Sequence, residues 1–172
     1  MPDNKAEKVN QDLNSTIASG PQGNSLGQRQ FVTFTVEGRV YAVDIMSVRE
    51  IRAWSNATRL PHQPSYMRGV LNLRGSIVPV QDLRNRFGMG NTMPDDNHVV
   101  VIVVIEDRLL GILVDDVSDI LTVNGEQIKA VPQGAVQVGE DFIEGLVNTD
   151  DGMVAILTLP LLFNEGFGDD SF

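Results

Sequence analysis

The feature that most constrains the fold is an internal repeat, because the second half of the chain restates segments of the first half in the same order. The offset between matching segments grows along the chain, as a longer loop in the second copy would produce, and we place that loop at 131–140. A repeat of this size predicts two copies of one small structural unit. The matching segments are 39–43 with 108–112, 48–51 with 117–120 and 69–72 with 145–148, followed by Val78 with Val154 and Phe87 with Phe163.

Each copy is predicted to hold about five short strands. Aromatic residues make up only 6% of the chain, so the core must be built from Val, Ile and Leu, and this β-branched bias favours strands. Residues 31–36 and 40–45 are two such strands around a Glu37-Gly38-Arg39 turn. A single five-stranded unit is marginal at this size, so the two units should pack together. We therefore predict an all-β, internally duplicated fold with short helical turns.

Composition sets the expected domain boundaries. The first 28 residues are polar, and the spacing of Val9, Leu13 and Ile17 gives only a weak helical pattern. That pattern holds too few apolar residues to offset chain entropy, so we expect a disordered leader that a partner could order in part. The expected divisions are a leader at 1–28, a domain at 29–165 with barrels at about 29–88 and about 97–159 and a closing helix at about 159–165, and a flexible acidic tail at 166–172.

A hairpin in the first copy carries an arginine at its tip. Apolar residues at 70–73 and 77–80 flank Arg74-Gly75-Ser76, where glycine supplies the positive φ of a tight turn. Pro79 has no N–H, which predicts an edge strand or a bulge. The second copy has an Asp-Gly turn instead, so the turn itself does not require Arg74. Two interpretations stay open: a solvated or internally paired charge, and a guanidinium presented to a partner.

A second candidate lies at Val48 and Glu50. These residues are two positions apart, so on a strand they share one face and Arg49 lies on the other. A core valine beside a boundary glutamate and a mixed apolar and acidic contact patch remain equally open.

The charge balance argues against several classes of partner. The net charge is −10, from 23 acidic and 13 basic residues, and such a surface repels phosphate backbones and anionic lipid. Arg84 and Arg86, near Arg74, come closest to a basic patch. The longest apolar run, 99–105, is far shorter than the roughly 20 residues of a membrane helix. The N-terminus also lacks a secretory signal. We expect a soluble, cytoplasmic protein that binds no nucleic acid and does not insert in membranes.

No set of residues predicts catalysis or a cofactor. The chain has no cysteine, and His62 and His98 belong to no metal-ligand spacing. Asp115, Asp116 and Asp119 lack the spacing of a calcium loop, so a solvated turn is the simpler interpretation. A small metal-dependent enzyme using this region is kept as a less favoured alternative.

A set of segments occurs in order along the chain: 48–51, the turn 72–75 with Pro79, 111–115, Gly145, 156–157 and 161–162. Together they resemble the CheW family of bacterial chemotaxis coupling proteins. The resemblance implies two five-stranded SH3-like barrels packed as one CheW-like domain. It also implies a non-enzymatic adaptor that bridges chemoreceptors to the histidine kinase CheA, through the kinase's regulatory domain.

The resemblance further implies a partner-binding site and a location. An apolar surface for a partner helix is expected in the groove between the barrels, and charged residues near the hairpin should contact receptor or kinase. The chain should be recruited to membrane-associated receptor arrays, although an adaptor of a different chemosensory pathway would look the same. The implied partner-binding residues are Ile45, Val48, Glu50, Ile51, Gly69 and Arg74.

Overall fold

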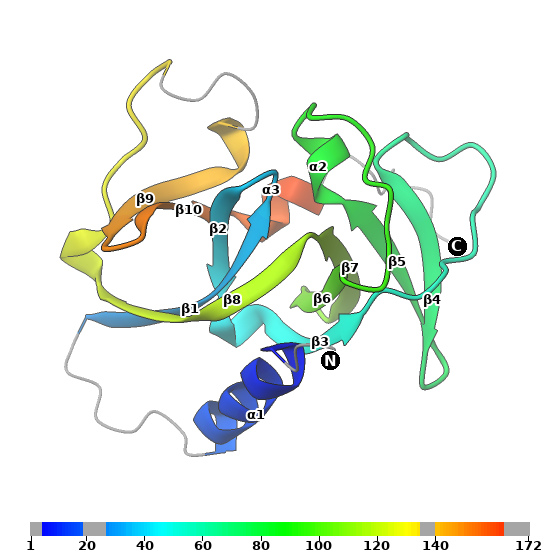
Figure 1. The fold of residues 1–172 in the computed structure, drawn as a ribbon, viewed down its shortest axis with the longest axis horizontal. Helices are drawn as coiled ribbons and strands as arrows, with labels where there is room; N and C mark the ends of the chain where they lie inside the picture. Colours follow the sequence, from blue (N-terminus) through cyan, green and yellow to red (C-terminus); the bar gives the residue numbers. More distant parts are fainter. Residues whose placement is uncertain (1–4, 19–26, 135–139, 164–172) are drawn as a thin grey trace.

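Two five-stranded sheets make up most of the structure (Figure 1). The computed structural model describes residues 5–18, 27–134 and 140–163, so the predicted tail at 166–172 and half of the predicted loop at 131–140 lie outside the described residues. The all-β prediction is confirmed. The elements are α1 (Lys5–Ala18), β1 (Gln28–Val36), β2 (Arg39–Asp44), η1 (Ile45–Ser47), β3 (Val48–Ala53), β4 (Met67–Leu73), β5 (Ser76–Asp82), α2 (Leu83–Arg86), β6 (Val99–Ile105), β7 (Arg108–Val114), β8 (Asp116–Asn124), η2 (Gly125–Gln127), η3 (Glu140–Phe142), β9 (Ile143–Thr149), β10 (Gly152–Leu157) and α3 (Leu159–Phe163).

Each sheet combines strands from both halves of the chain. The strand orders are β8-β1-β2-β10-β9 and β3-β6-β7-β5-β4. The predicted barrels at about 29–88 and 97–159 are therefore wrong as contiguous segments. Replacing each strand by its repeat counterpart, β1 by β6 through β5 by β10, converts one order into the other, so the duplication itself holds. The two copies exchange their last three strands, since β10 pairs in parallel with β2 and β5 with β7.

The largest hydrophobic cluster lies between the two sheets. It takes side chains from both, including Val43 of β2 and Ile112 of β7, whereas a smaller cluster lies against each sheet's other face. Gln81 of β5 is fully buried, and its amide atoms have no hydrogen-bond partner among the described residues. Its repeat counterpart in β10 is Leu157, which belongs to the shared cluster. The exchanged strands and this common core make the two halves one folding unit.

An arginine also ties the two halves together. The guanidinium carbon of Arg86, in α2, lies 4.5 Å from the ring centre of Tyr66 and 4.6 Å from that of Phe142. Tyr66 and Phe142 are repeat counterparts, so the cation contacts one aromatic residue from each copy. Such cation–π contacts contribute about 0.5–2 kcal/mol each, depending on solvent exposure.

Helix α1 lies in a segment that was predicted to be disordered. The leader was predicted to be disordered over 1–28, and this is wrong for residues 5–18, which form a helix against β3 and β8. Val9 is 3% exposed and Leu13 1%, and both join the shared cluster. The weak helical pattern was a correct signal. Its apolar face finds enough buried surface on the domain to offset the chain entropy that an isolated segment would lose.

Of the two alternatives predicted for Pro79, the edge strand is wrong, because β5 lies between β4 and β7. The other alternative, a bulge, is present close by, since the pairing of β4 with β5 shifts register between Met67 and Gly69, one residue along from Pro79. Pro79 is tolerated because the pairing with β7 begins one residue later, at Val80, so no ladder partner needs the missing N–H.

No helix among the described residues is long and apolar enough to cross a bilayer.

Candidate protein interface

The tip of the β4–β5 hairpin is held in a left-handed backbone conformation, which the tips of the β1–β2 and β6–β7 hairpins share at Glu37, Glu106 and Asp107. Arg74 and Gly75 have φ angles of 51° and 88°, which makes the turn the two-residue type with both central residues left-handed. The Gly75 N–H donates to Asn72 Oδ1 at 3.0 Å, which holds the turn. A non-glycine residue in the left-handed region costs about 1–2 kcal/mol. Arginine thus occupies a position where glycine or asparagine would be better tolerated.

Arg74 is both exposed and paired. Its side chain is 80% exposed, and its Nη1 lies 3.4 Å from Oε2 of Glu50, whose side chain is only 21% exposed. The other carboxylate oxygen of Glu50 lies 3.9 Å from Arg52 Nε. Exposed ion pairs contribute only about 0–1 kcal/mol, so this pair orients the guanidinium more than it stabilises the fold. Both open interpretations of Arg74 therefore survive: it has an internal acidic partner, and most of its surface faces solvent.

The three predicted apolar contact residues do not form an open surface. Ile45, Val48 and Ile51 are each at most 5% exposed and belong to the core between the sheets, together with residues of α1. They can influence a partner site through the edge strand β3 that they hold in place. Direct contact between these side chains and a partner stays a prediction.

Gly69 has a structural explanation that its repeat counterpart shares. It is buried with a φ of +127°, and a Cβ built on it would lie 2.3 Å from the Thr58 carbonyl oxygen. A Cβ on the counterpart, Gly145, would lie 3.0 Å from the Lys129 oxygen. At both places a preceding segment bridges to the strand, Thr58 to Val70 in the first copy. Gly69 therefore shapes the base of the hairpin and offers no side chain to a partner.

Sequence reasoning missed the contact that α1 makes with β3. The Asn10 side chain donates from Nδ2 to the Ile51 carbonyl oxygen at 2.7 Å and accepts from the Ile51 N–H at Oδ1 at 2.9 Å. Ile51 lies on the open edge of the sheet, because β3 is its end strand. The amide thus takes the place of a neighbouring strand. The only sequence signal was the four-residue spacing of Val9 and Leu13, between which Asn10 lies.

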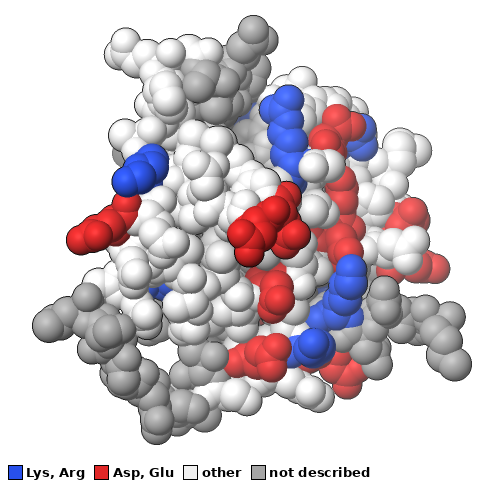
Figure 2. Space-filling model, turned by 60° about the vertical axis from the view of Figure 1, so that its left-hand side comes forward, with Lys and Arg blue, Asp and Glu red and all other residues white. Residues whose placement is uncertain are grey.

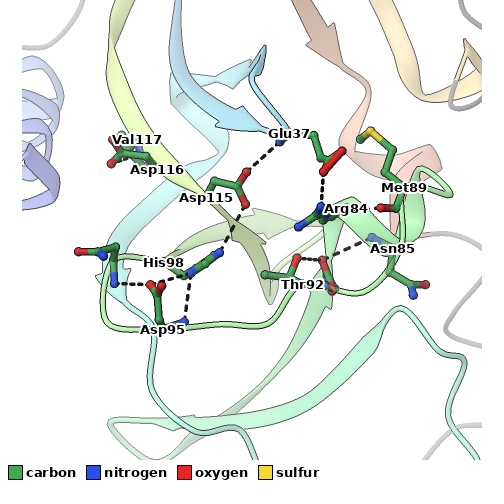
Figure 3. A network of polar contacts seen from close by, with 12 residues as sticks. Glu37, Arg84, Asn85, Met89, Thr92, Asp95, His98, Asp115, Asp116 and Val117 are labelled. Carbon is green, nitrogen blue, oxygen red and sulfur yellow. Dashed lines mark hydrogen bonds and ion pairs between the residues drawn. The ribbon is translucent and has the colours of Figure 1, made fainter.

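A polar network joins the two sheets at Asp115, directly before the start of β8 (Figure 3). Oδ2 of Asp115 accepts from the Glu37 N–H at 2.8 Å, and its Oδ1 lies 3.5 Å from His98 Nε2. The other ring nitrogen of His98 is 3.0 Å from Asp95 Oδ1. Glu37 pairs in turn with Arg84. Asp115 is consequently an ordered structural group rather than part of a solvated turn.

The same region fixes the linker between the halves. The buried carboxylate of Asp82 accepts from the Thr92 N–H at 2.8 Å and from its hydroxyl at 2.6 Å. In the linker, hydrogen bonding from the Asn97 N–H and the contact with His98 lower the pKa of Asp95 below its usual value.

Within the described part of the chain, no three His, Asp or Glu residues are grouped as metal ligands would be.

The surface charge follows the composition. Figure 2 shows acidic side chains running down the middle of one face, with few basic side chains between them and uncharged areas beside them. The arginines closest to a basic patch in the sequence are engaged elsewhere, Arg84 with Glu37 and Arg86 with the two aromatic rings.

Comparison with known proteins gives one consistent result. A family model described as the CheW-like domain matches residues 30–167. The "Probable chemotaxis protein CheW" of Rhizobium etli is 41% identical over 139 residues, which cover 81% of this chain and 90% of the relative. The "Chemotaxis protein CheW" of Klebsiella aerogenes is 37% identical over 83% of this chain and 86% of its own. The crystal structure of "scaffolding protein TtCheW" from Thermoanaerobacter tengcongensis superposes with a TM-score of 0.75 at 30% identity, covering 84% of this chain and 92% of that one.

Proposed function

The chain belongs to the CheW family, and from this membership we propose that it couples chemoreceptors to the histidine kinase CheA. A member of this family is a chemotaxis scaffold and not an enzyme. The proposed partners are the cytoplasmic tips of chemoreceptors and the regulatory domain of the kinase. Binding both would recruit the protein to receptor arrays at the membrane.

The observation that carries the proposed contact surface is the exposure of the Arg74 guanidinium at the tip of the hairpin. Its side chain is 80% exposed on a turn whose backbone disfavours arginine. Strained residues are retained where the surrounding structure holds them, and they gather at functional sites. The repeat counterpart of this turn, at Asp150 and Asp151, has no left-handed residue at these two positions. The counterpart turn thus lacks a left-handed arginine, although Glu106 and Asp107 of the second copy are left-handed at a different hairpin.

The chemistry of the tip suits an acidic or carbonyl-rich partner surface. A guanidinium has five donors in a planar fork, and a single 3.4 Å contact with Glu50 uses few of them. A partner carboxylate could share Arg74 with Glu50 or replace it. Truncating a central arginine contact at a protein interface typically costs about 2 kcal/mol or more of binding free energy.

The test is Arg74→Ala in the full chain, with Arg108→Ala as the control, because Arg108 is an exposed arginine beside another hairpin turn. Assembly with the kinase and a receptor cytoplasmic fragment is measured by sedimentation of the ternary complex, and folding by thermal melting. We expect Arg74→Ala to melt like the unmodified chain and to lose ternary assembly, while the control assembles normally. Normal assembly of Arg74→Ala would reject the proposed role of the hairpin tip. Failure of the unmodified chain to bind either partner would reject the coupling function.

A further inference from the structure

Helix α1 lies across the two end strands that the repeat makes equivalent. Strand β3 ends one sheet and its counterpart β8 ends the other, and α1 contacts both from outside (Figure 1). In the second copy, the described residues that precede β6 form the linker and contain no corresponding helix. The helix is therefore an addition to the duplicated fold, and the domain's sheets do not depend on it for any strand pairing.

The edge of β3 needs a partner that the edge of β8 does not. In β8, the Ile120 N–H donates to Oδ1 of the adjacent Asp119 at 2.8 Å. The repeat counterpart of Asp119 is Glu50, and its carboxylate points to Arg74 and Arg52 instead. Within the described residues, the Asn10 side chain bonds both the N–H and the carbonyl of Ile51 on this edge of the strand. Without α1, this edge would present one unpaired donor and one unpaired acceptor beside apolar surface.

The apolar part of the α1 attachment is small. Val9 and Leu13 are its fully buried side chains among those described, and Lys5 forms an exposed ion pair with Asp116 at 3.5 Å. An isolated helix shorter than about 12–15 residues is marginal in water, so the 14-residue α1 forms chiefly because it docks. Folding and docking of α1 are thus one equilibrium, and a second helix with the same contacts can compete in it.

We propose that α1 is an internal competitor for the helix-docking surface that the coupling function places at the joint between β3 and β8. The partner is an amphipathic helix with apolar residues four positions apart and an amide residue directly after the first, as in Val9, Asn10 and Leu13. Its amide pairs with the Ile51 backbone and its apolar residues fill the places of Val9 and Leu13. The proposal rests on the coupling function for the source of that helix, which is a chemoreceptor, and it makes α1 a regulator of receptor binding.

The test uses two full-chain variants that make the same chemical change. Asn10→Ala removes the side-chain amide that bonds the Ile51 backbone, whereas Asn14→Ala removes an exposed amide one turn later. Alanine favours a helix more than asparagine does, so release of α1 in Asn10→Ala would report the lost hydrogen bonds rather than a weaker helix. Amide hydrogen exchange at Ile51 measures docking of α1, and titration with a receptor cytoplasmic fragment measures competition.

We expect Asn10→Ala to accelerate exchange at Ile51 and to tighten binding of the receptor fragment by at least about fivefold, the lower end of the roughly 5- to 150-fold range that two neutral hydrogen bonds allow. Asn14→Ala should match the unmodified chain in both measurements. Equal or weaker binding by Asn10→Ala, with the Ile51 amide exposed, would overturn the competition.

A peptide with residues 5–18 tests the docking surface without any receptor. Added in trans to Asn10→Ala, it should restore protection of the Ile51 amide, and the same peptide carrying Asn10→Ala should not. No protection by the unmodified peptide at millimolar concentration would overturn the docking surface. Should no form of the chain bind the receptor fragment while the peptide still protects Ile51, the coupling function fails and the docking surface stands. Thermal melting of Asn10→Ala shows whether this variant is folded. Leu13→Ala provides a second variant in which α1 should be released.

Discussion

Replacing Arg74 by asparagine should make the protein more stable and less able to assemble. Asparagine tolerates the left-handed conformation better than arginine, and Asn-Gly is the preferred pair for a two-residue turn of this type. Relief of the left-handed conformation is worth about 1–2 kcal/mol. Loss of the exposed pair with Glu50 removes about 0–1 kcal/mol. The expected net gain is about 1 kcal/mol, or roughly 3 °C in Tm for a domain of this size.

Arg74→Ala separates the two contributions. Alanine loses the same ion pair but stays in the same left-handed conformation, so we expect no gain in its free energy of unfolding. Differential scanning calorimetry and urea titration of both variants measure the contrast, and sedimentation with kinase and receptor fragment measures assembly. The reasoning is refuted if the asparagine variant melts at or below the alanine variant. It is also refuted if the asparagine variant assembles normally, because the strain would then serve no partner.

Three further predictions concern stability. Gly69→Ala should cost at least about 2 kcal/mol of unfolding free energy, because its Cβ would lie 2.3 Å from the Thr58 oxygen at a φ of +127°; denaturant titration would contradict this with a change below about 0.5 kcal/mol. Gln81→Leu should stabilise the fold by about 1–3 kcal/mol, because the buried Gln81 amide has no partner among the described residues. Leucine is the residue at the repeat counterpart, Leu157, which lies in the shared cluster. A lower melting temperature of the variant would show that the amide has a partner. Asp95→Asn should lower stability near neutral pH but not in strong acid. The pKa of Asp95 is lowered by folding, so its contribution is complete above the unfolded value of 3.8 and is lost as the pH falls through the lower folded pKa; a Tm difference from the unmodified chain that persists unchanged at pH 2 would contradict this.

The repeat explains why much of the fold was predictable and why the strand exchange was not. Matching segments in the same order along both halves showed that β2 and β7, or β4 and β9, are equivalent structures. They carry no information on which copy supplies each strand's neighbour, because equivalent strands have equivalent patterns and pair equally well with either copy. The choice depends on how the chain leaves η1 toward β3, which is a property of the folded backbone.

The candidate site divides in the same way. The Arg-Gly turn and the spacing of Val48 and Glu50 could be read locally, since a hairpin and a strand are set by neighbouring residues. That Arg74 reaches Glu50, and that Asn10 reaches the backbone of Ile51, are contacts between segments far apart in the chain. The residue pattern within one segment does not predict such contacts.

By itself the sequence determined the class of fold, its duplication, the hairpin with its arginine and the family likeness, because each of these follows from residue types at short range or from order along the chain. Tertiary structure alone decided the exchange of strands, the burial of Ile45, Val48 and Ile51, and the docking of α1. Those outcomes are set by which surfaces meet when the chain closes on itself. A weak apolar pattern such as Val9 and Leu13 becomes ordered only when a complementary surface is there to bury it.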